Sequence, residues 1–183
     1  MSFAELAKSH LEGRDYSITV VPRVHSSVAI VVPHGGIIEP GTSALARAIA
    51  GEELNLYLFE GIRQAQNAET LHLTSHLFDE PQCLALLSRC DHVLTLHGCL
   101  GPDAAVFVGG LDEPLKSRVV AAIKETGTAV HATGHRFPAV NPNNICNRGR
   151  RGVGVQVELT RPLRMAGGGS VLVEALRAVM LSV

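Results

Sequence analysis

A short apolar run that ends in a histidine and two glycines, just before a helix signal, constrains this chain most. The run covers residues 28–32, continues as Pro33-His34-Gly35-Gly36, and is followed by a helix expected over 43–50. A buried strand that turns through glycines into a helix is typical of α/β proteins, which place their sites beyond the carboxyl ends of strands. We therefore expect an α/β fold with a functional site near His34.

The same alternation of strands and helices continues along most of the chain. Strands are expected over 17–22, 28–32, 54–59, 70–74, 92–96, 105–108, 128–132 and 152–159, and helices over 3–12, 43–50, 81–89, 112–126 and 169–181. Thr42 and Ser43 are suitable caps for the second helix. This order predicts a mixed, mainly parallel sheet with helices on both faces. No repeat or linker is visible, so residues 1–183 are expected to form a single domain.

Composition and charge argue against several classes of protein. Hydrophobic residues make up 46% of the 183, and the mean hydropathy is +0.20, which argues against disorder. A net charge of -1 and the absence of tryptophan give no reason to expect a nucleic-acid or membrane partner. The four cysteines have no C-x-x-C spacing, and the first residues lack a basic region followed by an apolar one. We therefore expect reduced thiols in a cytoplasmic protein.

Two histidines and a glutamate form the main candidate site. His34 and Glu39 flank a glycine turn that can fold back so that both side chains meet one ion, and His97 ends a second apolar run. Two imidazoles and one carboxylate are a common zinc ligand set that leaves a position for water. We therefore expect His34, Glu39 and His97 to bind zinc. Cys99 is a further candidate ligand, although a fourth protein ligand would close the site.

Each of these residues also has a simpler interpretation. The two glycines could form only a turn, Glu39 could be an acid at a helix start, and His97 could be a core residue. The glycine loop and the following helix could instead cradle a phosphate, although neither G-x-G-x-x-G nor G-K-[ST] occurs. The residues alone leave these interpretations open.

A carboxylate in the last expected strand is a second candidate for chemistry. Alternation in residues 154–159 places Gln156 and Glu158 on one face of that strand. A carboxylate in a largely buried sheet needs a cation partner or an acid–base role. A salt bridge from Glu158 to Arg161 or Arg164 is the simpler alternative.

The segment from residue 126 to residue 157 contains no Asp or Glu and is rich in arginine. Guanidinium groups bind carboxylates and phosphates, so such a segment beside a metal site predicts an acidic substrate. A solvated loop is the simpler interpretation for any one arginine. The residues expected to contact substrate are Arg148, Asn144, Arg161, Arg164 and His76.

Taken together, these motifs resemble the poly-γ-glutamate hydrolases of phages and Bacillus, a family also labelled phage-related replication proteins. The similar pieces cover about the whole chain in family order and are residues 33–43, 75–81, 97–99, 143–147 and 155–159. The resemblance implies a zinc carboxypeptidase-like fold, zinc held by His34, Glu39 and His97, and Glu158 as general base. The H-x₄-E spacing is that of this family, whereas zinc carboxypeptidases usually have H-x-x-E.

The prediction from sequence is therefore a zinc-dependent hydrolase that cleaves γ-glutamyl amide bonds with metal-activated water. One alternative is a zinc amidohydrolase that acts on another acidic acyl-amide. Another is a non-catalytic anion- or nucleotide-binding module, whose binding would survive chelation. A third is a metal-stabilised protein without activity.

Overall fold

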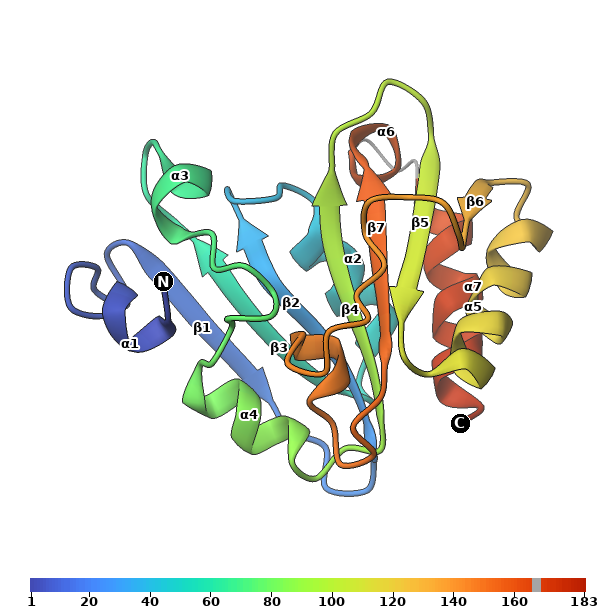
Figure 1. Ribbon diagram of the computed structural model, residues 1–183, viewed down its shortest axis with the longest axis horizontal. Helices are drawn as coiled ribbons and strands as arrows, with labels where there is room; N and C mark the ends of the chain where they lie inside the picture. The colour runs from blue at the N-terminus through green and yellow to red at the C-terminus, as the bar shows by residue number, and fades with distance from the viewer. Residues whose placement is uncertain (166–168) are drawn as a thin grey trace.

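Seven strands form one mixed sheet in the computed structural model, which describes residues 1–165 and 169–183. In chain order the elements are α1 (Phe3–Leu6), β1 (Tyr16–Val21), β2 (Val28–Gly36), α2 (Thr42–Ala50), β3 (Asn55–Gly61), α3 (Asn67–Leu71), α4 (Pro81–Leu87), β4 (His92–Cys99), β5 (Ala105–Gly110), α5 (Glu113–Glu125), β6 (Ala129–His131), η1 (Ile145–Asn147), β7 (Val155–Thr160), α6 (Arg161–Arg164) and α7 (Ser170–Leu181). The strand order is β1-β3-β2-β4-β7-β5-β6 (Figure 1). Only the β1–β3 and β5–β7 pairs are antiparallel within this sheet. The mainly parallel α/β fold predicted from sequence is confirmed.

Helices cover both faces of the sheet, as the alternating pattern predicts. On one face, α2, α5 and α7 pack against a first apolar core that contains Ile30 and Val157. On the other face, α1 and α4 cover a second core that contains Val31 and Tyr57 (Figure 1). Successive strand residues point to opposite faces, so the neighbours Ile30 and Val31 belong to different cores.

The second face becomes polar toward the carboxyl ends of β4 and β7. Val93 of β4 belongs to the second core, so alternation turns His97 to the same face. Val157 of β7 belongs to the first core, so Gln156 and Glu158 also face the second. Figure 1 shows β2, β4 and β7 pointing to the same end of the sheet, and His97 and Glu158 lie in the second halves of β4 and β7.

A bulge in β2 turns His34 to this second face. Val32 is paired with Leu58 of β3, whereas Gly35 is paired with Glu60, so β2 holds one extra residue between the two pairs. Strict alternation would point His34 the same way as Val32, into the first core. The extra residue reverses this and brings the imidazole to the polar end of the second face.

The hydroxyls expected to cap α2 instead hold the loop that carries Glu39. The N-cap of α2 is Gly41, which has no side chain to cap the helix. Thr42 Oγ1 donates to the Glu39 carbonyl at 2.8 Å, and Ser43 Oγ accepts from the Gly36 amide at 3.1 Å. The capping prediction was wrong, but the two residues fix the turn between His34 and α2.

Two other local predictions differ from the structure. The expected strand over 70–74 is absent, because α3 ends at Leu71 and an extended segment follows. Leu71 and Leu73 alternate because both fill the second core, and not because they belong to a sheet. The first helix ends at Leu6 and not near residue 12. All four cysteines are free and buried, and none of the described helices has the length and apolarity needed to cross a membrane.

Candidate metal centre

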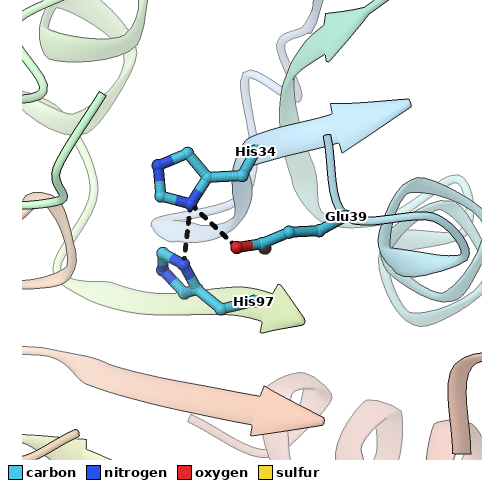
Figure 2. Close-up of side chains that lie close together, drawn as sticks. All are labelled: His34, Glu39 and His97. Atoms are coloured by element: carbon cyan, nitrogen blue, oxygen red, sulfur yellow. Dashed lines mark hydrogen bonds and ion pairs between the residues drawn. The ribbon is translucent and has the colours of Figure 1, made fainter. Parts of the chain in front are cut away.

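Three side chains from β2, the β2–α2 loop and β4 converge beyond the sheet (Figure 2). The Nδ1 atoms of His34 and His97 are 3.2 Å apart, and His34 Nδ1 is 3.4 Å from Glu39 Oε1. One ligand atom from each residue fits within a 4.8 Å cluster. A tetrahedral ion with bonds of about 2.0–2.1 Å separates its ligand atoms by roughly 3.3–3.4 Å. The donor set and its spacing therefore fit a zinc ion.

Backbone groups orient two of these side chains. His34 Nε2 lies 2.5 Å from the Leu73 carbonyl, so this nitrogen carries the proton and leaves Nδ1 free. Glu39 Oε2 accepts a hydrogen bond from the Gly98 amide at 2.7 Å, and Oε1 faces His34. Both side chains thus present an unprotonated atom to the centre of the cluster.

Burial and neighbouring groups keep two of the candidate ligands, His97 and Glu39, in metal-binding protonation states. Burial, together with the nearby His34, lowers the pKa of His97 to about 3, so its imidazole is neutral at physiological pH. Burial alone would raise the pKa of Glu39, but His34, His97 and the Gly98 amide hold it below its ordinary value. Neutral imidazole and ionised carboxylate are the forms that bind a divalent cation.

The loop predicted to cradle phosphate in one alternative has few free amides. The Gly36 amide donates to Ser43 Oγ, and the Ile37 amide donates to the Gly61 carbonyl at 2.9 Å. The Ile38 amide donates to the Gly35 carbonyl at 3.2 Å. Because a phosphate site needs such amides unoccupied, this geometry favours the metal interpretation of the loop.

His72 is a third imidazole at the centre, and sequence analysis did not identify it. Its ring stacks on that of His34 with centroids 3.9 Å apart and planes at 20°, and its Nε2 is 3.7 Å from Glu39 Oε1. It directly follows α3, within the segment predicted as a strand. The chain before it shows neither an apolar strand nor a glycine turn, so nothing in the sequence marks it as a site residue.

A cavity of about 510 Å³ opens over the candidate ligands. Its wall includes Gln156 and Glu158 of β7 and a stretch of the irregular segment that contains Arg136. A second cavity of about 420 Å³ adjoins it, because both are lined by Glu39 and His72. The cluster therefore lies at the junction of two cavities.

The structure brings most of the predicted substrate-contact residues to these cavities. Asn144 and His76 line the first cavity, and Arg161 and Arg164 line the second. Arg148 is exposed and lines neither cavity, so the structure does not bring it to the site.

Arg164 is committed to the protein backbone. Its guanidinium donates to the carbonyls of Leu159 at 3.0 Å, Cys99 at 3.4 Å, and Pro40. These contacts tie the ends of β7 and β4 to the loop that carries Glu39. Arg164 thus shapes the second cavity, and its donors are largely used.

Glu158 is buried, yet it has no ion-pair partner among the residues that the structure describes. The salt bridge to Arg161 or Arg164 that the sequence left open is not formed. Burial and the Glu39 charge raise the pKa of Glu158 to about 8, while Arg136 and Arg164 oppose the rise. A carboxyl group with a pKa near neutrality can both take up and release a proton.

A chain of amide hydrogen bonds leads to this carboxyl group. Asn144 Oδ1 accepts from the Cys146 amide at 3.1 Å, which directs Asn144 Nδ2 toward Gln156 Oε1 at 3.0 Å. Gln156 Nε2 must therefore donate, and it reaches Glu158 Oε1 at 3.0 Å. Glu158 Oε2 makes no hydrogen bond to the described residues, so it is the oxygen available for proton transfer.

Cys99 is close to the centre but does not belong to the ligand cluster. Burial and the Glu158 charge raise the pKa of its thiol to about 11, so it stays protonated. Because zinc binds thiolate, this environment disfavours Cys99 as a fourth ligand.

A mixed, mainly parallel sheet with two histidines and a glutamate clustered on one face defines an α/β protein with a candidate metal site. The chain belongs to the poly-gamma-glutamate hydrolase family, whose sequence model matches residues 1–167. It is 35% identical to the UPF0714 protein YndL of Bacillus subtilis over 89% of this chain, and 34% identical to YmaC of the same organism over 90%. The matched region spans 64% of YndL and 70% of YmaC.

Solved structures agree with this assignment. A bacteriophage poly-gamma-glutamate hydrolase matches with a TM-score of 0.93 and 28% identity, over 99% of this chain and 95% of that one. A zinc-free form of YndL matches with a TM-score of 0.85 and 30% identity, over 99% and 94% of the chains. N-formylglutamate amidohydrolase from Ralstonia eutropha shares the fold at a TM-score of 0.58 and 15% identity, over 92% and 96% of the chains. The family resemblance seen in the sequence is confirmed.

Proposed function

We propose that this protein hydrolyses the γ-glutamyl amide bonds of poly-γ-glutamate with a zinc ion held by His34, Glu39 and His97. The observation that carries the proposal is the close approach of His34 Nδ1 to His97 Nδ1 at 3.2 Å and to Glu39 Oε1 at 3.4 Å, beside the buried Glu158 carboxyl group, which has no ion-pair partner among the described residues. Membership of the family supports the choice of substrate. The two buried imidazoles of His34 and His97 and the buried carboxyl group of Glu158 would be a costly arrangement without such a function.

Glu158 is the proposed general base. A bound zinc ion would polarise the scissile carbonyl and lower the pKa of a water molecule. Glu158 accepts the proton of that water and returns it to the leaving amide nitrogen. The Gln156 amide holds Oε1, which leaves Oε2 to carry the proton between the two atoms. The buried setting keeps bulk water from competing for this proton.

The two cavities supply the proposed substrate contacts. Each residue of poly-γ-glutamate retains a free α-carboxylate, so a bound strand needs cations or amide donors along its path. Arg161 offers an exposed guanidinium in the second cavity, while His76 and Asn144 line the first. In this proposal Arg164 acts mainly through the carbonyls that it holds in place.

The direct test follows the chain length of poly-γ-glutamate by size-exclusion chromatography. The purified protein is expected to shorten the polymer, to lose this activity after chelation, and to regain it when zinc is added back. Polymeric glutamate with ordinary α-linkages serves as the matched control and should stay intact. Intact poly-γ-glutamate in every zinc-loaded sample would reject the substrate, and full activity in chelator would reject the metal.

A further inference from the structure

Residues 135–139 form an anchored segment, of which residues 136–139 line one wall of the first cavity. His135 bridges the segment to the sheet, because its Nε2–H donates to the Val108 carbonyl and its Nδ1 accepts from the Phe137 amide, both at 3.2 Å. The Gly110 amide donates to the Pro138 carbonyl at 2.9 Å. A side chain at Gly109 would place its Cβ 2.4 Å from the Phe137 carbonyl oxygen, so the close packing requires glycine there.

Arg136 is the one arginine within this anchored segment, which contains no lysine. Its guanidinium carbon lies 4.9 Å from the centre of the Phe137 ring, and that ring packs 5.6 Å from Phe107 of β5. No carboxylate of the described residues lies within ion-pair distance of Arg136, although the residue lines the first cavity. Its guanidinium is therefore supported from one side and available for an anion on the other.

Arg136 and Glu158 lie on the wall of the same cavity. Both line the first cavity, and the charge of Arg136 lowers the pKa of Glu158 against the effect of burial. Phe107, which supports Phe137, is the pairing partner of Glu158 across β5 and β7. Arg136 and the proposed base therefore border one cavity and are connected through the Phe137–Phe107 contact and the β5–β7 pairing.

The chemistry of a γ-linked glutamate chain places a carboxylate next to that nitrogen. The scissile amide nitrogen is bonded directly to the α-carbon of the next glutamate, and this carbon carries the free α-carboxylate. On the acyl side, the nearest carboxylate is three carbons from the scissile carbonyl. A cation that shares the cavity with Glu158 is therefore best placed for the carboxylate on the leaving side.

We propose that Arg136 binds the α-carboxylate of the glutamate on the leaving side of the scissile bond and so determines specificity for that residue. This role of Arg136 rests on the proposed hydrolase function. The feature of the substrate that it recognises is the α-carboxylate next to the scissile nitrogen. A planar guanidinium can take a carboxylate with two parallel hydrogen bonds, which a lysine cannot reproduce.

The test uses a defined γ-linked glutamate pentamer and a second pentamer in which one internal residue is 4-aminobutyrate, which lacks only the α-carboxylate. Mass spectrometry of the products compares cleavage at the bond to 4-aminobutyrate with cleavage at the matching bond to glutamate. The zinc-loaded protein should prefer glutamate by about 10- to 100-fold in kcat/KM. Arg136→Gln should erase this preference by slowing only the glutamate bond, and Arg136→Lys should restore part of it. Lys124→Gln, on the exposed side of α5, is the control and should keep the full preference.

Calorimetric binding of both pentamers to the metal-free protein separates this inference from the proposed function. If neither pentamer is cleaved, but the glutamate pentamer binds more tightly and Arg136→Gln removes the difference, the function fails and the role of Arg136 stands. If the polymer is cleaved and Arg136→Gln keeps the preference for glutamate, the function stands and the role of Arg136 is refuted. Equal loss on both pentamers would also refute it, because the arginine would then read a feature that they share.

Discussion

His97 and Glu158 lie directly opposite each other in the parallel pairing of β4 with β7. Both side chains point to the second face, so a candidate metal ligand and the candidate base are fixed by strand register and not by a loop. Sites built on strands hold their geometry more tightly than sites built on loops. The register therefore places the proposed base beside His97 of the candidate metal centre.

Replacement of Glu158 by glutamine is expected to remove catalysis and leave the metal in place. The glutamine can still accept from Gln156 Nε2, but it cannot accept the proton of the attacking water. We expect kcat to fall by about 10²- to 10⁴-fold, with an unchanged zinc content per protein chain. Steady-state kinetics and elemental analysis of the same sample check both statements. Near-normal turnover would remove Glu158 from the mechanism.

The same variant should change how the stability of the metal-free protein depends on pH. The pKa of Glu158 is raised from 4.5 to about 8, so the folded state holds this proton more tightly than the unfolded chain does. Stability from this group is therefore full below about pH 4.5 and declines as the pH rises toward 8. The free energy of unfolding of Glu158→Gln should change less with pH than that of the wild type, by up to about 1.4 kcal/mol per pH unit. Urea unfolding at several pH values from 5 to 8 gives the free energy of unfolding of both proteins. The same pH dependence of this free energy in the two proteins would contradict the assigned shift.

Gln156 should matter although it contacts no candidate ligand directly. Leucine at this position would leave Asn144 Nδ2 and Glu158 Oε1 without their present partners, at a cost of about 1–3 kcal/mol in unfolding free energy. The hydrogen bond that Gln156 Nε2 donates to Glu158 stabilises the ionised carboxylate. Without it, the pKa of Glu158 should rise. The acidic limb of the pH–rate profile should then move to higher pH. An unmoved profile in a folded Gln156→Leu protein would show that this amide does not tune the base.

The end of β2, just after the bulge, requires glycine at position 36. Gly36 has a φ of 62°, and a Cβ there would lie 2.4 Å from the Gly61 carbonyl oxygen. Gly13 also has a positive φ, 80°, but open space where a Cβ would point, so Gly13→Ala isolates the conformational cost of about 1–2 kcal/mol. Gly36→Ala should cost about 2 kcal/mol more in chemical denaturation and weaken zinc binding, because His34 lies within the bulge two residues before Gly36. Equal losses in the two variants would show that the contact with Gly61 is not limiting.

The fold and the three candidate ligands were largely predictable from sequence, since apolar strands and glycine turns place side chains at strand ends. The direction of His34 was not, because one extra residue in β2 decides which core the imidazole faces. The position of His72 at the candidate site was also hidden, and Arg136 was not separated from the other arginines of its acid-free segment. One depends on stacking after a short helix, and the other on anchoring by Val108 and Gly109, far away in the sequence.

The arginines also show what the sequence does not predict, namely which guanidinium groups are free to bind a substrate. Composition predicts an acidic substrate, but it does not separate a free guanidinium from an occupied one. Arg164 was expected to bind substrate, yet its contacts reach carbonyls as distant as that of Pro40. Arg136 was one of several arginines in an acid-free segment, and only the cavity wall distinguishes it.

Zinc stoichiometry measured on dialysed protein tests the central claim most directly. The wild-type chain should retain about one zinc ion, whereas His34→Ala and His97→Ala should each lose most of it, because each removes one of three protein ligands. His25→Ala removes an exposed imidazole outside the cluster and should bind like wild type. Full zinc occupancy in folded His97→Ala protein would contradict the shared site of His34, Glu39 and His97.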